Sequence, residues 1–228
     1  MNKLISFIVL LFISAQLKAQ SSVPQIAFGA GGGVATAFTG TVLQKNTIAF
    51  YSDAAYYPLP YLNVNIGVQA GSLSGTSSGT RNRKSFTNNF NAEMINGELQ
   101  LGIIIKPDIN GFFDIVRNIY GGAGYGVINS DITNVNIFNP AITNHVKNTI
   151  HIVPIKVGYE LTIVKNIYQE PLLRLNGCLN LNYVKGEGLD GYYDKNTAPH
   201  SFYTYVSLGL GYAISLRHGA AKDYNKFD

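Results

Sequence analysis

The stretch from residue 200 to residue 216, HSFYTYVSLGLGYAISL, alternates between two kinds of side chain at almost every step. Its even positions are mostly large and apolar: Phe202, Thr204, Val206, Leu208, Leu210, Tyr212, Ile214 and Leu216. Its odd positions are small, polar or aromatic: Ser201, Tyr203, Tyr205, Ser207, Gly209, Gly211, Ala213 and Ser215. A period of two places successive side chains on opposite faces of a β-strand. The stretch therefore predicts one long strand with an apolar face and a face of small and polar residues.

The same alternation recurs along the rest of the chain and predicts eight strands. We expect them at residues 26–41, 47–57, 62–74, 91–105, 118–131, 149–163, 171–185 and 202–216. Long polar connections at 75–89, 132–148 and 186–200 alternate with shorter ones, of which "PLP" at 58–60 is the sharpest break. This alternation predicts three outward loops at one end and short turns at the other, with the very short 43–46 connection as an exception.

Which face is buried decides between two kinds of eight-stranded barrel. A soluble, lipocalin-like carrier turns its apolar face inward around a ligand, whereas a membrane barrel turns that face outward to lipid. Charged residues make up only 13% of the chain, and the polar face is mostly Gly, Ala, Ser, Asn and Gln, which suits a crowded interior better than a wet surface. We therefore predict an all-β, eight-stranded antiparallel up-and-down transmembrane β-barrel. The residues expected to face lipid include Leu173, Leu175, Leu179, Leu181, Val206, Leu208, Leu210 and Ile214.

The first residues of the chain predict export. Residues 1–19 have a basic start, an apolar core and a small residue at Ala19, as in a signal peptide. We expect a barrel over residues 20–216 and a short periplasmic tail at 217–228. Beyond residue 19 the chain carries 15 basic and 13 acidic residues, so its charge does not indicate nucleic acid as a partner. The single cysteine, Cys178, excludes an intramolecular disulfide.

Three segments carry a family resemblance: the leader ending in Ala-Gln, "YGGAGYGVINSD" and "YVSLGLGYAISL". With these segments the chain resembles the outer-membrane β-barrel domains common in the Bacteroidota, which are similar in architecture to the transmembrane domain of outer membrane protein A. The resemblance implies a location in the outer membrane of a Gram-negative bacterium and a partnership with the barrel-assembly machinery. In contrast to outer membrane protein A, we expect no peptidoglycan-binding domain after residue 216. The chain also carries Leu216, rather than an aromatic residue, at the end of the last strand.

Four charged residues fall on the predicted inner face: Glu98, Lys156, Glu160 and Arg174. An eight-stranded barrel is just wide enough for side chains to fill it. We therefore expect these residues to form a paired polar network in the lumen, with a gated conductance through them as the alternative.

Catalytic chemistry has weak support in the sequence. His145, His151 and His200 fall near the predicted outer end, and Asp190, Asp194 and Ser201 lie close to them in sequence. They show none of the spacings of known hydrolases or metal sites, and GAGGG at 29–33 lacks the Lys-Ser/Thr of a phosphate-binding loop. We expect no catalytic residues, no metal and no cofactor. An outer-membrane enzyme that acts on lipid or peptide stays as the alternative.

The expected role is structural or adhesive, through contacts of the outward loops with the envelope. The basic segment TRNRKSF at 80–86 could bind the phosphates of lipopolysaccharide, although a solvated loop tip explains it as well. The partners we expect are outer-membrane lipid or lipopolysaccharide, the barrel-assembly machinery, and an extracellular or secretion-system partner. A soluble lipocalin-like carrier is the remaining alternative.

Overall fold

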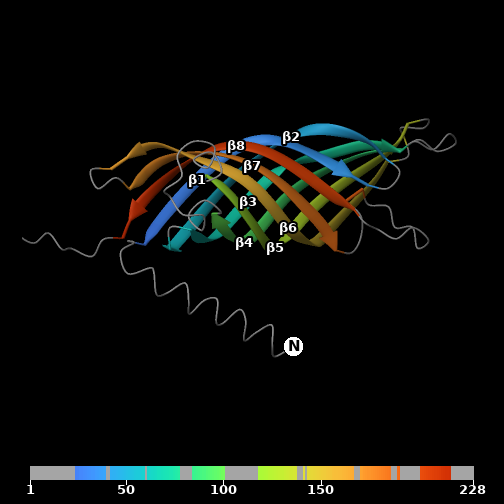
Figure 1. Cartoon of the computed structure of the whole chain (residues 1–228). Coiled ribbons are helices and arrows are strands. Elements are labelled where there is room, and N and C mark those ends of the chain that lie inside the picture. The colour runs from blue at the N-terminus through green and yellow to red at the C-terminus, as the bar shows by residue number, and fades with distance from the viewer. Residues whose placement is uncertain are drawn as a thin grey trace, which may run out of the picture.

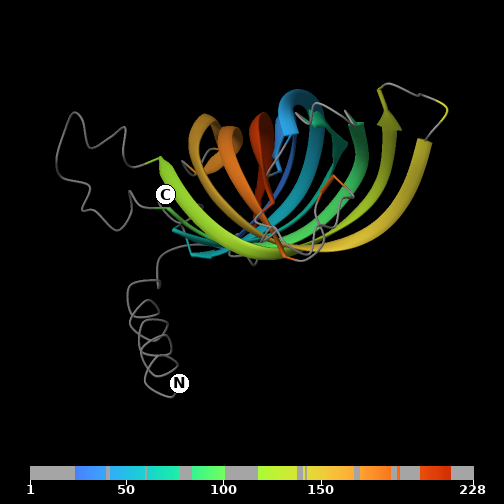
Figure 2. The ribbon, with the colours of Figure 1, turned by 90° about the vertical axis from the view of Figure 1, so that its right-hand side faces the viewer.

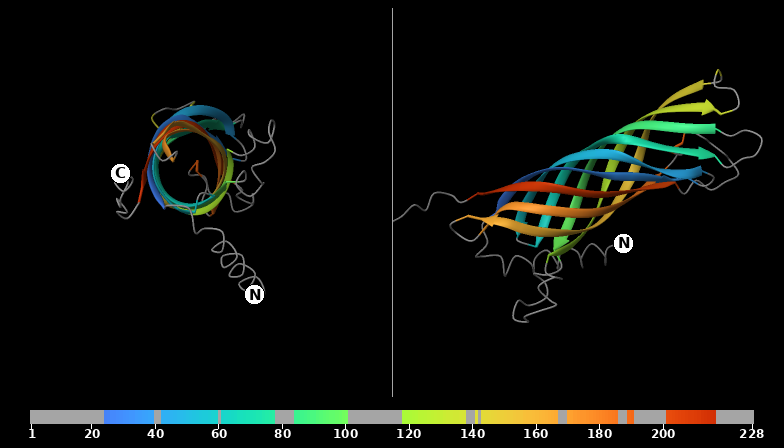
Figure 3. Two further views of the ribbon diagram at one scale, coloured as in Figure 1. Left: turned by 60° about the vertical axis from the view of Figure 1, so that its left-hand side comes forward. Right: turned by 90° about the horizontal axis from the view of Figure 1, so that it is seen from above.

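Eight antiparallel strands close into one barrel, and this confirms the predicted fold class. The computed structural model describes residues 24–39, 42–59, 61–77, 84–100, 118–137, 141, 143–166, 170–185, 189–190 and 201–216. The strands are β1 (Gln25–Phe38), β2 (Val42–Leu59), β3 (Leu62–Ser77), β4 (Lys84–Gln100), β5 (Ile119–Asn136), β6 (Thr143–Lys165), β7 (Pro171–Lys185) and β8 (Phe202–Ser215). Each strand pairs with its neighbours in sequence, and β8 closes the ring against β1 (Figures 1 and 3).

The two ends of the barrel differ in what they carry. At one end, called here the terminal end, Gln25 of β1 pairs with Ser215 of β8, so both chain ends leave the barrel there. At the other, the loop end, the chain passes from β1 to β2, β3 to β4, β5 to β6 and β7 to β8. The β5–β6 hairpin reaches beyond the rest at this end (Figures 2 and 3). No helix among the described residues is long and apolar enough to cross a membrane.

Several strands extend further toward the loop end than the sequence predicts. Residues 84–89 and 143–148, predicted as loops, belong to β4 and β6, and residues 43–46, predicted as a connection, belong to β2. Polar residues on the outward face of these extensions hide the alternation that makes a strand recognisable in sequence. The predicted strand residues 101–105, the signal peptide at 1–19 and the tail at 217–228 lie outside the described residues.

Glycine allows the ring to close tightly between β1 and β8. A Cβ atom on Gly33 would overlap the carbonyl of Val206 and lie 2.6 Å from the Cα of Ser207, so only hydrogen fits between the two backbones. A Cβ on the neighbouring Gly32 would point the other way and meet only the Phe50 ring, at 3.1 Å. The glycines that the sequence placed on the inner face therefore set the approach of the first and last strands.

We predict that Gly33→Ala destabilises the barrel by about 1–3 kcal/mol, because the new methyl group must push two backbones apart. Gly32→Ala is the matched control, because the Phe50 side chain can rotate away, and it should change the free energy of unfolding by less than about 0.5 kcal/mol. Urea unfolding of the two variants in detergent measures the difference. Equal stabilities would contradict the tight closure of this seam.

Candidate functional site

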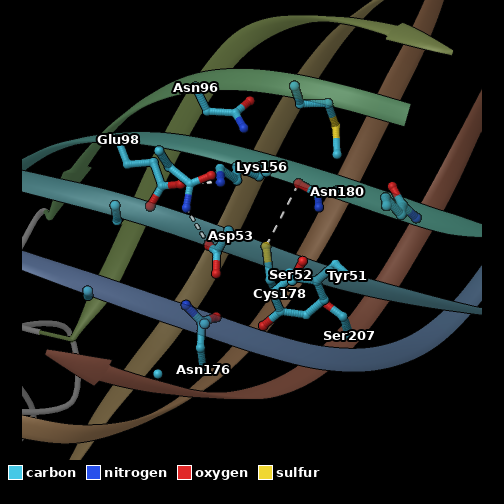
Figure 4. Close-up of a pocket in the computed structure, with 18 of the residues that line it drawn as sticks. Tyr51, Ser52, Asp53, Asn96, Glu98, Lys156, Asn176, Cys178, Asn180 and Ser207 are labelled. Atoms are coloured by element: carbon cyan, nitrogen blue, oxygen red, sulfur yellow. Dashed lines mark hydrogen bonds and ion pairs between the residues drawn. The ribbon is translucent and has the colours of Figure 1, made fainter. Parts of the chain in front are cut away.

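The first ion pair of the lumen joins Lys156 of β6 to Glu98 of β4 (Figure 4). Their side chains are only 10% and 7% exposed, so each charge depends on the other for compensation. Asn63 of β3 donates its Nδ2 hydrogen to Oε2 of Glu98 at 3.1 Å. Asn65, two residues further along β3, donates a hydrogen bond to Asp53 of β2. Residues of β2, β3, β4 and β6 thus place charged and amide groups together on the inner face of the barrel.

The second ion pair lies nearer the terminal end. Arg174 Nη1 donates to Oε1 of Glu160 at 2.9 Å, and Nη2 donates to Oε1 of Gln25 at 2.6 Å. The guanidinium also lies 4.5 Å from the centre of the Tyr57 ring. Gln100 donates a further hydrogen bond to Glu160 at 3.2 Å. This group connects β1, β2, β4, β6 and β7 across the lumen.

The structure thus brings together the four charged residues that the sequence placed in the lumen, as two ion pairs. Sequence reasoning missed most of their neutral partners: Gln25, Tyr57, Asn63 and Gln100. Their position on the inward face of each strand was the available signal, since Asn63 and Gln100 share that face with Glu98. The sequence of one strand does not show which inward residue of another strand lies across the lumen from it. That depends on the register of all eight strands.

Both ion pairs line a cavity of about 80 Å³, together with neutral polar and apolar residues. Its lining includes Tyr51, Asp53, Asn96, Tyr120 and Cys178 (Figure 4). Tyr120 donates a hydrogen bond to Asn176 at 2.8 Å. A cavity of this size has room for several water molecules and not for a lipid or a peptide. Among the described residues, no group of three His, Cys, Asp or Glu side chains could hold a metal ion.

The half of the lumen nearer the loop end holds a large apolar cluster beside a few buried amides such as Asn88 and Gln69, which corrects the expectation of a small and polar interior. A single buried cluster fills it, made of Ala35, Ala37, Ala49, Leu73, Phe86, Phe90, Ala92, Ile128, Ile150, Ile152, Val184, Leu189, Tyr203 and Tyr205. Two of these residues, Phe86 of β4 and Leu189 between β7 and β8, lie in segments that the sequence assigned to loops. Phe86 belongs to the segment at 80–86, predicted as an exposed basic loop, yet it is buried.

Leu189 helps to close the mouth of the barrel at the loop end. It lies between β7 and β8, and its side chain is fully buried within the apolar cluster. Asn88 of β4 holds it there by donating a hydrogen bond to the Leu189 carbonyl at 3.0 Å. Tyr203 donates across the lumen to Gln69 at 3.2 Å. An apolar layer at the loop end and an ionic layer toward the terminal end therefore close the lumen in series.

The outward face of the barrel is largely apolar, whereas the surface of a soluble protein is mainly polar and charged. Large apolar side chains are exposed on every strand, including Phe28, Phe50, Ile66, Ile95, Tyr125, Val157 and Leu179. Of the residues predicted to face lipid, Val206, Leu208, Leu210, Ile214, Leu179 and Leu181 are exposed, and Leu173 and Leu175 are partly exposed on the same face. An exposed apolar surface of this extent marks a site of contact with a membrane or another protein.

This apolar belt has a sharp upper boundary on β3, β4, β5 and β6. The outward cross-strand row of Ile66, Ile95 and Tyr125 is apolar. The next row toward the loop end, which runs Val68, Glu93, Val127 and His151, is mixed. The rows beyond it, beginning with Ala70, Asn91, Asn129 and Thr149, are mainly polar. The extended parts of these strands, called here the protruding wall, thus rise above the belt.

The height of the belt can be estimated on β6, where outward apolar residues run from Val153 to Ile163. At a rise of about 3.3 Å per residue and a strand tilt of about 40°, this segment covers about 25 Å. The apolar band of outer-membrane barrels is also about 25 Å tall. The belt therefore has the dimension needed to cross a hydrocarbon layer.

The histidines that the sequence singled out do not converge on a reaction centre among the described residues. His145, predicted in a loop, lies in β6 and bonds to Thr133 at 3.1 Å. His151 is exposed on the outward face and stacks on Tyr125, with ring centroids 5.8 Å apart. Ser201 and Asp190 are buried instead. His200 and Asp194 lie outside the described residues.

Comparison with known proteins identifies the fold and no family. No protein-family model and no curated protein sequence matches the chain. Among solved structures it is similar to Ail, the attachment invasion locus protein of Yersinia pestis, with a TM-score of 0.50 and 7% identity over 85% of this chain and 100% of that one. Neisserial surface protein A follows with a TM-score of 0.42 and 10% identity over 82% and 96% of the two chains. The outer membrane protease OmpT of Escherichia coli has a TM-score of 0.42 and 11% identity over 86% and 100%.

We predict that Arg174→Ala destabilises the barrel by about 3–5 kcal/mol, because it leaves the buried Glu160 without its cation. The double variant Arg174→Ala/Glu160→Gln should recover part of this loss. Urea unfolding in detergent measures both.

The matched control is Lys147→Ala at the exposed Lys147–Asp131 pair, whose atoms lie 3.8 Å apart and whose side chains are 82% and 49% exposed. Its removal should cost less than about 1 kcal/mol, since solvent screens both charges. If Arg174→Ala were as mild as this control, the lumen pair would not be a stabilising feature.

Proposed function

We propose that this protein is a small outer-membrane barrel with a closed lumen, which acts through its outward surface in a structural, adhesive or envelope-binding role. The observation that carries the proposal is the inversion of the two faces: apolar side chains cover the outside, and an ionic network and an apolar plug fill the inside. A barrel of this kind is embedded in lipid by its belt and presents its loop end to the exterior. The likeness of its fold to Ail is consistent with this location.

The inversion counts against the alternative of a soluble carrier. A lipocalin-like protein needs its apolar face to line a ligand cavity. Here the Leu and Val side chains of β8 are exposed on the outside, and the cavity in the lumen measures about 80 Å³. No apolar ligand of ordinary size would be held there.

We also propose that the protein is not an enzyme. A hydrolase or acyltransferase needs a nucleophile and a base within hydrogen-bond reach. His151 is exposed on the outward face and bonds to Tyr125, whereas Ser201 is buried. An unchanged lipid profile after deletion of the protein would support the non-enzymatic role, and the loss of one acylated or cleaved lipid species would refute it.

The protruding wall is the surface through which we propose that the protein contacts its partners. Ail is named for attachment and invasion, which describes that protein alone. For this chain we propose contacts with outer-membrane lipid and, at the tip of the wall, with an extracellular or secretion-system partner. Insertion of the belt would require the barrel-assembly machinery of a Gram-negative bacterium.

We predict that the protein fractionates with the outer membrane and migrates faster on gels when it is not boiled, because a closed hydrogen-bonded barrel resists detergent. Membrane fractionation followed by electrophoresis with and without boiling tests this. A protein recovered in the soluble periplasm with no shift in mobility would refute the membrane assignment.

We predict no steady ion conductance when the purified barrel is inserted in a planar lipid bilayer, since the apolar plug and the ion pairs obstruct the lumen in series. Single-channel recording measures this. Reproducible open steps that disappear in Lys156→Ala or Glu98→Ala would show instead that the lumen is a gated path.

A further inference from the structure

The protruding wall carries an open groove on its outward side, immediately above the belt. The groove has a volume of about 690 Å³ and crosses β3, β4, β5 and β6. Its outward side chains form two cross-strand rows, which are Asn91, Asn129 and Thr149 in the lower row and Asn89, Asp131 and Lys147 in the upper row. These side chains combine three amides, one hydroxyl and one pair of opposite charges, and Ala70 of β3 adds a small apolar residue to the outward lining.

The chemistry of these groups favours a ligand rich in hydroxyls. Each amide offers two N–H donors and a carbonyl acceptor, and a sugar hydroxyl both donates and accepts. Two contacts join these side chains: Thr149 donates to Oδ1 of Asn129 at 3.1 Å, and Lys147 lies 3.8 Å from Asp131. The two charges balance, so the groove has no excess of positive charge with which to select a phosphate or a nucleic acid.

The position of the groove indicates where its ligand comes from. The row of Ile66, Ile95 and Tyr125 belongs to the belt, and only the mixed row of Glu93 and His151 separates it from Asn91 and Asn129. The groove also opens sideways, along the plane of the membrane, and not at the tip of the wall. A molecule bound in it would stand beside the barrel at the height of the lipid headgroups, with any acyl chains against the apolar residues below.

An aromatic pair lies at the boundary beneath the groove. Tyr125 stacks on His151 with an interplanar angle of 26°, and both rings lie on the outward face. Rings that are apolar on their faces and polar at one end are typical of the level at which acyl chains give way to headgroups. From the belt toward the loop end, the outward face thus carries apolar residues, then an aromatic pair, and then a groove of hydrogen-bonding side chains.

We propose that this groove binds the saccharide headgroup of a glycolipid in the outer leaflet, through hydrogen bonds from Asn89, Asn91 and Asn129. The inference rests on the proposed function, because it needs the belt to lie in the membrane. It goes beyond that function by assigning one surface and one ligand class. A glycolipid held in this way would fix the protruding wall relative to the membrane surface.

The test uses the full mature chain, folded in a non-ionic detergent, and titrates it with four probes. These are rough lipopolysaccharide, the core oligosaccharide released from it by mild acid, the remaining lipid A, and phosphatidylglycerol. We expect the oligosaccharide to bind and the intact glycolipid to bind at least tenfold more tightly, because its acyl chains also contact the belt. Calorimetry or saturation-transfer NMR measures the affinities.

The variant Asn91→Ala/Asn129→Ala should weaken oligosaccharide binding by about tenfold, the loss expected when about 1.4 kcal/mol of hydrogen bonding is removed. Its matched control is Thr36→Ala/Asn46→Ala, which removes a hydrogen-bonded outward pair (2.8 Å) between β1 and β2 and should leave binding unchanged. Gel mobility without boiling verifies that each variant is folded. If the double variant does not fold, Asn91→Ser serves in its place, with a smaller expected loss.

Three results would overturn the site: no binding of the oligosaccharide, binding of lipid A or phosphatidylglycerol only, or equal weakening by the test and control variants. Any of these, in a protein that still fractionates with the outer membrane, refutes the glycolipid site alone. Recovery of the protein in the soluble periplasm would refute the proposed function as well.

Discussion

The hydrogen-bonded closure of β8 on β1 is the constraint on which the rest of the structure depends. In a hydrocarbon layer each unpaired backbone group costs several kcal/mol, so a sheet can cross only when it has no open edge. Here the closing pair runs in continuous register from Gln25 and Ser215 to Phe38 and Phe202, and small residues such as Gly33 and Gly209 allow the two backbones to approach. Once the ring is closed, the two-residue period divides every strand into a face toward the lumen and a face toward the surroundings.

That division explains both the low share of charged residues in the sequence and the closed lumen. The few charges within the belt point inward, where Lys156 meets Glu98 and Arg174 meets Glu160. The outward positions at the same height carry aliphatic and aromatic side chains, which need no solvation. Above the belt the pattern inverts on one wall, so that amides and charges face outward while Phe86, Ile132 and Ile150 pack inside. The barrel is thus one continuous sheet that passes through two environments.

Most of the fold could be predicted from the alternation alone, because the strands within the belt show it cleanly. The two ion pairs were predictable as inward charges, and their pairing followed once the ring was closed. The apolar plug was not predicted, because the outward residues of the protruding wall are as polar as a loop and conceal the strand period at 84–89 and 143–148. Ile150 and Ile152 do share the inward face with Lys156, and this was the signal available. The buried Leu189 could not be predicted, since its burial depends on contacts with residues far away in sequence, such as Asn88 of β4.

The central claim, that the exposed apolar belt lies in lipid and the polar rows stand above it, is tested most directly by cysteine accessibility in intact cells. In a Cys178→Ser background, single cysteines replace outward residues at two heights of the same strands: Thr87 and His145 above the boundary and beyond the groove, Ile95 and Val157 below it. We predict rapid labelling of Thr87→Cys and His145→Cys by a membrane-impermeant maleimide, and protection of Ile95→Cys and Val157→Cys until detergent is added. Equally rapid labelling at both heights in intact cells would contradict it.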